Sequence, residues 1–245
     1  MRYLIGVDDT DNLESRGTGF RARCLGVDLA KAGLARIDGV SRHQLYVHPD
    51  IPYTSHNSSL CLDADVVSGG YDDVVALCRE FLLRESAEGS DAGLCIAGFD
   101  ALDGEVVEFG QNAQHTVLNQ QQARSLAQHA GVYLEGLTGD HGGIIGALAG
   151  VGLRKSGNDG RFVWLKGVRE LSGLARAGDL LRTTGVDGIE DRDGNPVPPE
   201  AMICVDPWPR AVLVGARAVL LVEKAESEND GFEWRLLPRE EIRRY

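Results

Sequence analysis

Apolar and polar positions alternate in short runs that predict a series of strands and helices in the first half of the chain. Residues 3–7 are an apolar run that ends in acidic residues, as in a buried strand. Residues 20–32 carry apolar side chains at helical spacing, and Gly33 is suited to ending that helix. Residues 74–82 hold an i, i+3, i+4, i+7, i+8 apolar stripe, which is typical of an amphipathic helix. Further strands are predicted at residues 44–47, 59–62 and 92–99.

The second half begins with a polar stretch, residues 112–129, in which residues 120–122 belong to a predicted surface helix. A glycine-rich turn at residues 137–143 then enters an apolar helix. Strands are predicted at residues 162–165, 201–205 and 211–223, and a long polar loop at residues 185–199. This alternation of strands and helices predicts an α+β fold of mixed α/β layers. We place the domain boundary near residue 132, which gives domains of residues 1–131 and 132–245.

The composition predicts a globular protein and argues against the membrane, secreted and disulfide-rich classes. Apolar residues make up 43% of the 245 residues, enough to build a core in one large or two small domains. No apolar stretch approaches the ~20 residues that cross a membrane, and charge appears too early for a secretory signal. The five cysteines are scattered and never form a C-x-x-C pair, which predicts neither a disulfide framework nor a zinc ribbon. We expect a cytoplasmic protein.

The net charge of −12 bears on partners, because nucleic-acid affinity comes largely from Lys and Arg that release counterions from phosphates. The sequence holds no Lys/Arg-rich run. The balance favours a small cationic or metal-complexed ligand over tRNA or DNA, and tRNA binding is expected only with the help of a partner protein. Homo-oligomerisation is left open.

An acidic cluster follows the first predicted strand. Asp8, Asp9 and Asp11 lie within four residues at the carboxyl end of that strand, where α/β sheets place ligand sites. Three carboxylates so close together repel one another unless a cation compensates. Mg²⁺ prefers oxygen ligands and bridges one or two carboxylates to nucleotide phosphates, so the cluster predicts a magnesium site. The alternative is an acidic turn with an Asx cap.

A glycine-flanked threonine opens the helix that follows. Gly17, Thr18 and Gly19 could present backbone N–H groups to a phosphate of ATP, helped by the helix dipole. Arg21 lies one turn inside and would strengthen phosphate binding if it faces the ligand. A structural turn and a solvent-exposed arginine are the alternatives.

Three other features are candidates for ligand contact. His141, Gly142 and Gly143 form a second glycine-rich helix entry, which either lets a ligand approach the backbone or allows tight packing. Asn57 belongs to a polar patch before a strand and is a candidate ATP contact, with a surface loop as the alternative. Trp208 stands between two prolines and either stacks on a planar group or fills the core. No Walker loop, G-x-S-x-G or kinase H-R-D motif is present.

Four motifs in order resemble the archaeal tRNA-isoleucine agmatidine synthetase family (TiaS). They are residues 5–11, residues 49–53 followed by Asn57, residues 143–152 and residues 207–215. The resemblance implies a kinase-like N-terminal domain that binds ATP and Mg²⁺, followed by a ferredoxin-like domain that helps to hold agmatine. It makes Asp8, Asp9 and Asp11 the metal and catalytic acids.

The resemblance also implies which residues line the amine pocket. The sequence differs from the family in two places. The entry containing Gly146 would line that pocket, together with Asp206 and Trp208 of the late segment. Where the family has Gly-x-Cys-Thr-Thr with a phosphate-accepting threonine, this chain has residues 17–21 as Gly-Thr-Gly-Phe-Arg, so Thr18 is the nearby hydroxyl, displaced by two positions. The OB-fold and zinc ribbon that grip tRNA in the family have no counterpart in the sequence.

The function expected from these features is an ATP- and Mg²⁺-dependent phosphotransferase or ligase that acts on a small, agmatine-like amine and an unidentified acceptor. A Mg²⁺-dependent phosphatase or nucleotide hydrolase would need the same aspartates but no second substrate. A non-catalytic protein that binds a nucleotide or a cationic metabolite is the third alternative.

Overall fold

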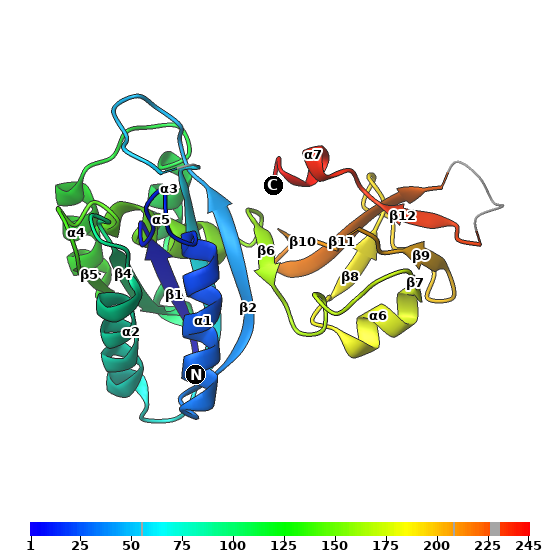
Figure 1. Ribbon diagram of the computed structural model, residues 1–245, viewed down its shortest axis with the longest axis horizontal. Helices are drawn as coiled ribbons and strands as arrows, with labels where there is room; N and C mark the ends of the chain where they lie inside the picture. Colours follow the sequence, from blue (N-terminus) through cyan, green and yellow to red (C-terminus); the bar gives the residue numbers. More distant parts are fainter. Residues whose placement is uncertain (55, 208, 226–230) are drawn as a thin grey trace. The chain divides into compact units, whose positions relative to one another are not determined.

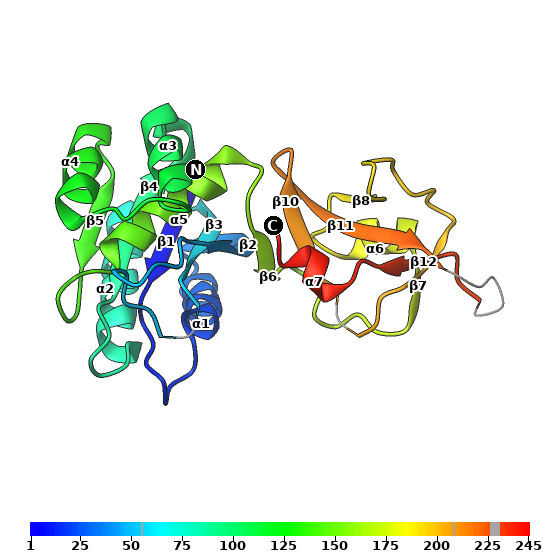
Figure 2. The ribbon, with the colours of Figure 1, turned by 90° about the horizontal axis from the view of Figure 1, so that it is seen from above.

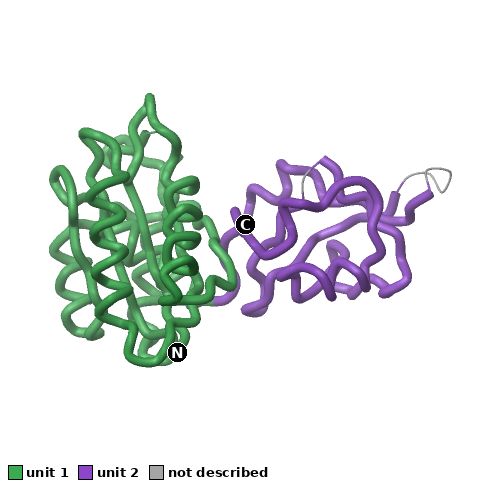
Figure 3. Tube along the Cα trace, turned by 60° about the horizontal axis from the view of Figure 1, so that its bottom comes forward, with its two compact units in different colours: residues 1–156 green, residues 157–245 purple. Residues whose placement is uncertain are grey.

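The computed structural model describes residues 1–54, 56–207, 209–225 and 231–245, and the chain divides into two compact units, Met1–Ser156 and Gly157–Tyr245 (Figure 3). The boundary thus follows Ser156, not residue 132. The 25 residues in between belong to the first unit because β5 (Tyr133–Gly136) pairs with its sheet and α5 (Ile144–Ser156) packs on that sheet.

The first unit is built around a five-stranded sheet with the order β5-β4-β1-β3-β2, in which every neighbouring pair is antiparallel (Figure 1). The bounds of the other strands are β1 (Arg2–Asp8), β2 (Ala35–Gln44), β3 (Ser58–Val66) and β4 (Gly93–Gly98). β1 lies in the middle, covered on both faces, which explains why residues 4–7 are all buried.

Helices cover both faces of this sheet. α1 (Thr18–Lys31) and α2 (Tyr71–Glu85) lie on one face, and α5 lies on the other with α3 (Gly104–Asn112) and α4 (Gln120–Ala130) beside it (Figure 2). A short 3₁₀ turn, η1 (Phe99–Ala101), follows β4. The predicted helices near residues 20–32, 74–82 and 120–122 are confirmed as α1, α2 and α4. α3 was not predicted.

The order β1-α1-β2-β3-α2-β4, with strand order β4-β1-β3-β2, is the ferredoxin-like arrangement. The sequence predicted a ferredoxin-like domain after residue 132. The structure has this arrangement at residues 2–98 instead, because β3 and β4, the strands that pair with β1, both come from these residues. The mixed α/β class is confirmed. A kinase-like domain stays a prediction.

The strand predicted at residues 44–47 begins where the observed strand ends. β2 is Ala35–Gln44, and the backbone N–H of Tyr46 already donates to the carbonyl of Ala113 outside the sheet. β2 shows no apolar alternation in the sequence because two of its buried side chains, Ser41 and His43, are polar and because its pairing with β3 shifts register between Ile37 and Gly39.

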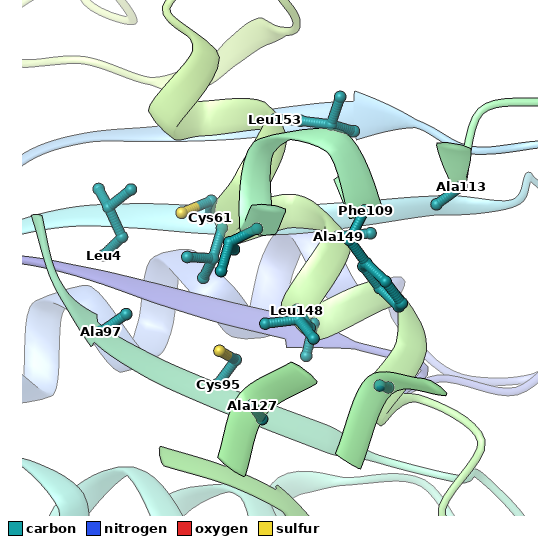
Figure 4. Packing of buried hydrophobic residues seen from close by; sticks show 14 of the residues in the cluster. Leu4, Cys61, Cys95, Ala97, Phe109, Ala113, Ala127, Leu148, Ala149 and Leu153 are labelled. Carbon is teal, nitrogen blue, oxygen red and sulfur yellow. The ribbon is translucent and has the colours of Figure 1, made fainter. Parts of the chain in front are cut away.

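One core cluster of the first unit lies between the sheet and α5 and includes Leu4, Leu148 and Phe109 (Figure 4). Cys61 and Cys95 belong to the same cluster, on the strands that flank β1. All five cysteines are free thiols: Cys61, Cys78 and Cys95 are buried, whereas Cys24 and Cys204 are half-buried.

The second unit consists mainly of short strands with the order β6-β10-β11-β12-β9-β7, and β8 pairs parallel with β11. The bounds are β6 (Arg161–Trp164), β7 (Leu174–Arg176), α6 (Ala177–Thr183), β8 (Gly188–Glu190), β9 (Met202–Cys204), β10 (Ala211–Val214), β11 (Arg217–Lys224), β12 (Trp234–Leu236) and α7 (Arg239–Ile242). The loop predicted at residues 185–199 therefore contains a strand, and the strand predicted at residues 211–223 is a hairpin. Within the described ranges, no helix has the length and apolar character needed to span a membrane.

Candidate functional site

β1 delivers two consecutive carboxylates to one cavity. The strand ends at Asp8, and Asp9 adopts a left-handed backbone conformation with φ 49°. Successive residues of a strand point to opposite faces, so the turn at Asp9 is what allows both side chains to line the same space. Asp is one of the few non-glycine residues that occupy this conformation readily, and such residues often mark functional sites.

The cavity has a volume of about 300 Å³ and lies within the first unit. Its walls come from the end of β1, the segment between β2 and β3, the residue Asp91 before β4, the segment between α3 and α4, and the turn that leads from β5 into the start of α5. The described residues that line it are Asp8, Asp9, Leu45, Asp50, Ile51, Pro52, Asn57, Asp91, Ala113, Thr116, Val117, Leu118, Asn119, Gln120, Asp140, Gly142, Gly143, Ile145 and Gly146.

The lining combines acidic and apolar surface. Its five aspartates are Asp8, Asp9 and Asp91, which are half-buried, and Asp50 and Asp140, which are exposed. Leucine, isoleucine, valine, proline and alanine side chains form the rest of the wall, and the described lining residues include no Lys, Arg or His. Such a space suits a cation that carries an apolar portion, and repels an anion that arrives without a counter-ion.

Burial and mutual repulsion disfavour the charged forms of the two aspartates at the end of β1. Burial raises the pKa of Asp8 well above its usual range, and the neighbouring Asp9 and Asp11 charges raise it further. Burial also raises the pKa of Asp9 to about 6, helped by the charges of Asp91, Asp11 and Asp140. A bound cation would remove this repulsion, which is the electrostatic signature of a site for positive charge.

Two of the aspartates also hold the turn that precedes α5. A carboxylate oxygen of Asp91 accepts the backbone N–H of Asp140 at 2.6 Å, and a carboxylate oxygen of Asp140 accepts that of Gly142 at 2.8 Å. The backbone carbonyl of Asp91 accepts the N–H of Gly143 at 2.9 Å. These bonds fix the glycine-rich entry against the start of β4 and leave the two glycines lining the cavity without side chains.

Asp11 and Thr18, which were predicted to act with Asp8 and Asp9, form a separate arrangement. The Thr18 hydroxyl donates to an Asp11 carboxylate oxygen at 2.6 Å, and the Thr18 backbone N–H donates to the same oxygen at 3.3 Å. Gly17 is the N-cap residue of α1 and makes no side-chain cap, so Asp11 does the capping. Among the described lining residues of the cavity, neither Asp11 nor Thr18 is present.

Of the other predicted phosphate contacts, some lie away from the cavity and one lines it. The Arg21 guanidinium donates to the carbonyls of Glu85 and Arg16, which ties α1 to the end of α2. Gly19 lies inside α1, where a Cβ would come within 3.8 Å of a Leu60 methyl group. Asn57 does line the cavity, and its side-chain amide donates to the Tyr46 carbonyl at 2.6 Å.

The predicted amine contacts are also split. Gly142, Gly143 and Gly146 line the cavity, whereas His141 has φ 71° and lies against Gly136. Asp206 belongs to the second unit, where its carboxylate accepts the backbone N–H of Gly173 at 3.0 Å. Trp208 lies outside the described residues.

Three aspartates of the cavity, Asp50, Asp91 and Asp140, were not among the predicted site residues. Asp50 and Asp140 stand inside the motifs at residues 49–53 and 137–143, and Asp91 immediately precedes a predicted strand, so the available signals were acids inside those motifs and an acid at a strand end. Across residues 1–54, 56–207, 209–225 and 231–245, no group of three or more His, Cys, Asp or Glu side chains has a geometry ready to hold a metal. Asp8 and Asp9 line the cavity together and Asp11 is not among its described lining residues, so a magnesium site of all three carboxylates stays a prediction.

No family model matches the sequence, and the comparison with curated proteins gives no match. The fold is similar to three crystal structures, each aligned over 62% of this chain. They are a tRNA fluorescent labeling enzyme (24% identity, TM-score 0.55), TiaS in complex with tRNA and ATP (23%, 0.55), and TiaS in complex with tRNA, AMPCPP and agmatine (22%, 0.53). The chain spans 36% of the length of each of those chains. The resemblance to TiaS seen in the sequence therefore extends to the fold.

Proposed function

We propose that the chain is an ATP- and Mg²⁺-dependent ligase or phosphotransferase that uses a small cationic amine, with its site in the acidic cavity of the first unit. The observation that carries the proposal is the pair Asp8 and Asp9 in a cavity with three more aspartates and no basic side chain among its described lining residues. The similar fold of TiaS, solved with tRNA, AMPCPP and agmatine, supports the same chemistry.

The two carboxylates fit a magnesium ion that is shared with a nucleotide. Mg²⁺ in nucleotide sites is bound by one or two carboxylates, with phosphate oxygens and waters completing its shell. Asp8 and Asp9 meet that requirement without Asp11, which caps α1. ATP would bring an activated phosphoryl group, and Mg²⁺ would neutralise its charge.

The protein would hold the triphosphate through the metal. The N–H groups of Gly142 and Gly143 are already donated to Asp140 and to the Asp91 carbonyl, and the described lining offers no Lys or Arg to a phosphate. The remaining aspartates, Asp50, Asp91 and Asp140, would bind the ammonium or guanidinium end of the amine. The apolar wall would hold its hydrocarbon stem and exclude water.

Isothermal titration calorimetry tests the proposal directly. Wild-type protein is titrated with MgATP and with agmatine as the amine probe, beside Asp8→Asn and the matched control Asp65→Asn. Asp65 is a half-exposed acid on β3 that contacts the N-terminus and Arg36, so its change removes the same charge away from the cavity. We expect Asp8→Asn to weaken MgATP binding by about tenfold or more, a loss of one charge-assisted contact, and the control to behave as wild type. Absence of binding heat in the wild type would exclude this function.

A second candidate, a non-catalytic receptor for a cationic metabolite, is favoured by the lack of basic side chains in the described lining. The two candidates differ in turnover. ATP hydrolysis or transfer that starts only when an amine is added supports the ligase, turnover without amine supports a nucleotide hydrolase, and amine binding without any turnover supports the receptor.

The acceptor is a separate question. The TiaS structures contain tRNA, but the charge of this chain argues against tRNA binding without a partner protein. Filter binding of total tRNA at physiological salt tests this, and tight binding by the isolated chain would contradict the charge argument.

A further inference from the structure

Gly146, in the first turn of α5, occupies a position where a side chain would collide with Asp8. A Cβ atom at residue 146 would lie 1.7 Å from a carboxylate oxygen of Asp8, 2.5 Å from its Cγ and 3.1 Å from its Cβ. A Cβ atom essentially never comes within 3.0 Å of a heavy atom of a residue that is not its chain neighbour. The carboxylate of Asp8 therefore fills the volume that any other amino acid would take at this position.

The start of α5 has little freedom to move away from the sheet. A Cβ at Gly6 of β1 would lie 2.0 Å from the Ala147 carbonyl oxygen, and one at Gly93 of β4 would lie 2.1 Å from the Gly143 carbonyl carbon. The helix thus approaches two strands backbone to backbone on both sides of residue 146. A substituent at that residue would displace the Asp8 side chain sooner than the helix.

We propose that Gly146 is a positioning residue: its missing side chain seats the Asp8 carboxylate against the first turn of α5, in the orientation that binds a cation in the cavity. The role differs from lining an amine pocket, because Gly146 acts through Asp8. The positive end of the helix dipole supports a carboxylate in this place. The inference rests on the proposed cation binding by Asp8 and Asp9, and its test separates the two claims.

The steric part is tested without any ligand, by a double-mutant cycle in urea followed by far-UV circular dichroism. Gly146→Ala is compared in the wild-type and Asp8→Ala backgrounds, since Asp8→Ala removes the two shortest contacts. We expect about a tenfold or greater loss in the folding equilibrium constant with Asp8 present and less than about twofold without it. If Gly146→Ala alone does not fold, recovery of folding in the Asp8→Ala background supports the same steric role.

Gly150→Ala is the matched control, one turn later on the same helix. Its Cβ would lie 2.4 Å from the Ser59 hydroxyl oxygen, so the substitution also crowds a side chain of the sheet, but not Asp8. Its cost should be equal in both backgrounds. A Gly146→Ala cost that is likewise independent of Asp8 would overturn the positioning role.

The binding part uses Mn²⁺ as the probe, with free ion measured by electron paramagnetic resonance. We expect Gly146→Ala to weaken Mn²⁺ binding by about tenfold or more, and Gly150→Ala to leave it unchanged. Equal Mn²⁺ affinity of Gly146→Ala and wild type would overturn the inference while sparing the metal proposal. Failure of wild type to bind Mn²⁺, with the coupling to Asp8 intact, would overturn the metal proposal and leave the steric claim standing.

Discussion

Residues 1–156 carry 21 Asp and Glu side chains against 12 Lys and Arg, whereas residues 157–245 carry 16 against 13. In the second unit the charges pair with one another at the surface: Arg192 contacts Glu223 and Glu241, and Arg235 also contacts Glu223. The first unit also has surface ion pairs, such as that of Arg79 with Glu135, but five of its aspartates converge on one cavity. Most of the excess of acidic over basic residues therefore belongs to the first unit, and five of its 21 acidic side chains line the cavity where we propose that a cation binds.

The two units can also be followed by different spectroscopic signals. All three tryptophans, Trp164, Trp208 and Trp234, lie in the second unit. Tryptophan fluorescence therefore follows the second unit, while far-UV circular dichroism follows both. Changes confined to the first unit should shift the dichroism transition and leave the fluorescence transition in place.

The largest effect is expected from Asp63→Ala, which breaks a buried charge network in the first unit. Asp63 accepts from Arg2 at 2.9 and 2.7 Å and from Arg154 at 2.7 Å, and the Asp63 and Arg154 side chains are almost fully buried. Removing one partner of a buried pair costs about 3–5 kcal/mol of unfolding free energy. Urea denaturation followed by circular dichroism measures the loss.

Asp65→Ala is the control for that experiment. Asp65 lies two residues along the same strand, but its contacts with the N-terminus and Arg36 are exposed, so about 0–1 kcal/mol is expected. Equal losses for the two variants would show that the network contributes nothing beyond surface charge.

A smaller loss is expected from Gly93→Ala. The new Cβ would lie 2.1 Å from the carbonyl carbon of Gly143 and 2.4 Å from the N of Ile144, both backbone atoms that cannot rotate away. Overpacking of this kind costs about 1–3 kcal/mol, again visible in the dichroism transition. Gly178→Ala in the second unit meets its nearest atom, the Pro199 carbonyl oxygen, at 3.1 Å and should cost clearly less. A larger loss of unfolding free energy for Gly178→Ala than for Gly93→Ala would contradict the tighter backbone packing that we infer for the first unit.

The smallest effect concerns pH in metal-free buffer. Because the pKa of Asp9 is raised in the folded state to about 6, the folded protein binds the proton more tightly than the unfolded chain does. The resulting stabilisation is present below the unfolded pKa and is lost as pH rises through about 6. Since Asp9 is half-exposed, we expect less than about 1 kcal/mol.

Asp9→Asn isolates this contribution, because Asn also tolerates the left-handed conformation. Thermal melts of wild type between pH 4.5 and 7.5 should fall more steeply with rising pH than those of Asp9→Asn. Parallel profiles would show that Asp9 titrates normally. Added Mg²⁺ should raise the wild-type melting temperature most at the high end of this range.

The sequence was informative where a pattern is local. The strand at residues 3–7 and the stripe at residues 74–82 are fixed by short-range periodicity, so β1 and α2 were predictable. β5 and the domain boundary were not, because Tyr133–Gly136 is a strand only through its pairing with β4, some 40 residues earlier.

The residues of the site were likewise predictable only where a local pattern marks them. Asp8 and Asp9 could be found because they end a strand, and Asn57 and the glycines because they stand in short motifs. Asp11 could not be separated from them, since the left-handed turn at Asp9 that directs it to α1 leaves no mark in the sequence. Asp91 joins the cavity only because the turn before α5 folds back on the start of β4.

The placement of the cysteines makes the difference between the two units accessible to chemical labelling. Burial raises the pKa of Cys78 to about 12 and those of Cys61 and Cys95 still further, so these thiols will resist alkylation while the first unit is folded. Cys24 on α1 and Cys204 on β9 are the half-buried thiols, one in each unit. A maleimide dye should therefore mark each unit once without any substitution, and the later appearance of three more reactive thiols would time the opening of the first unit alone.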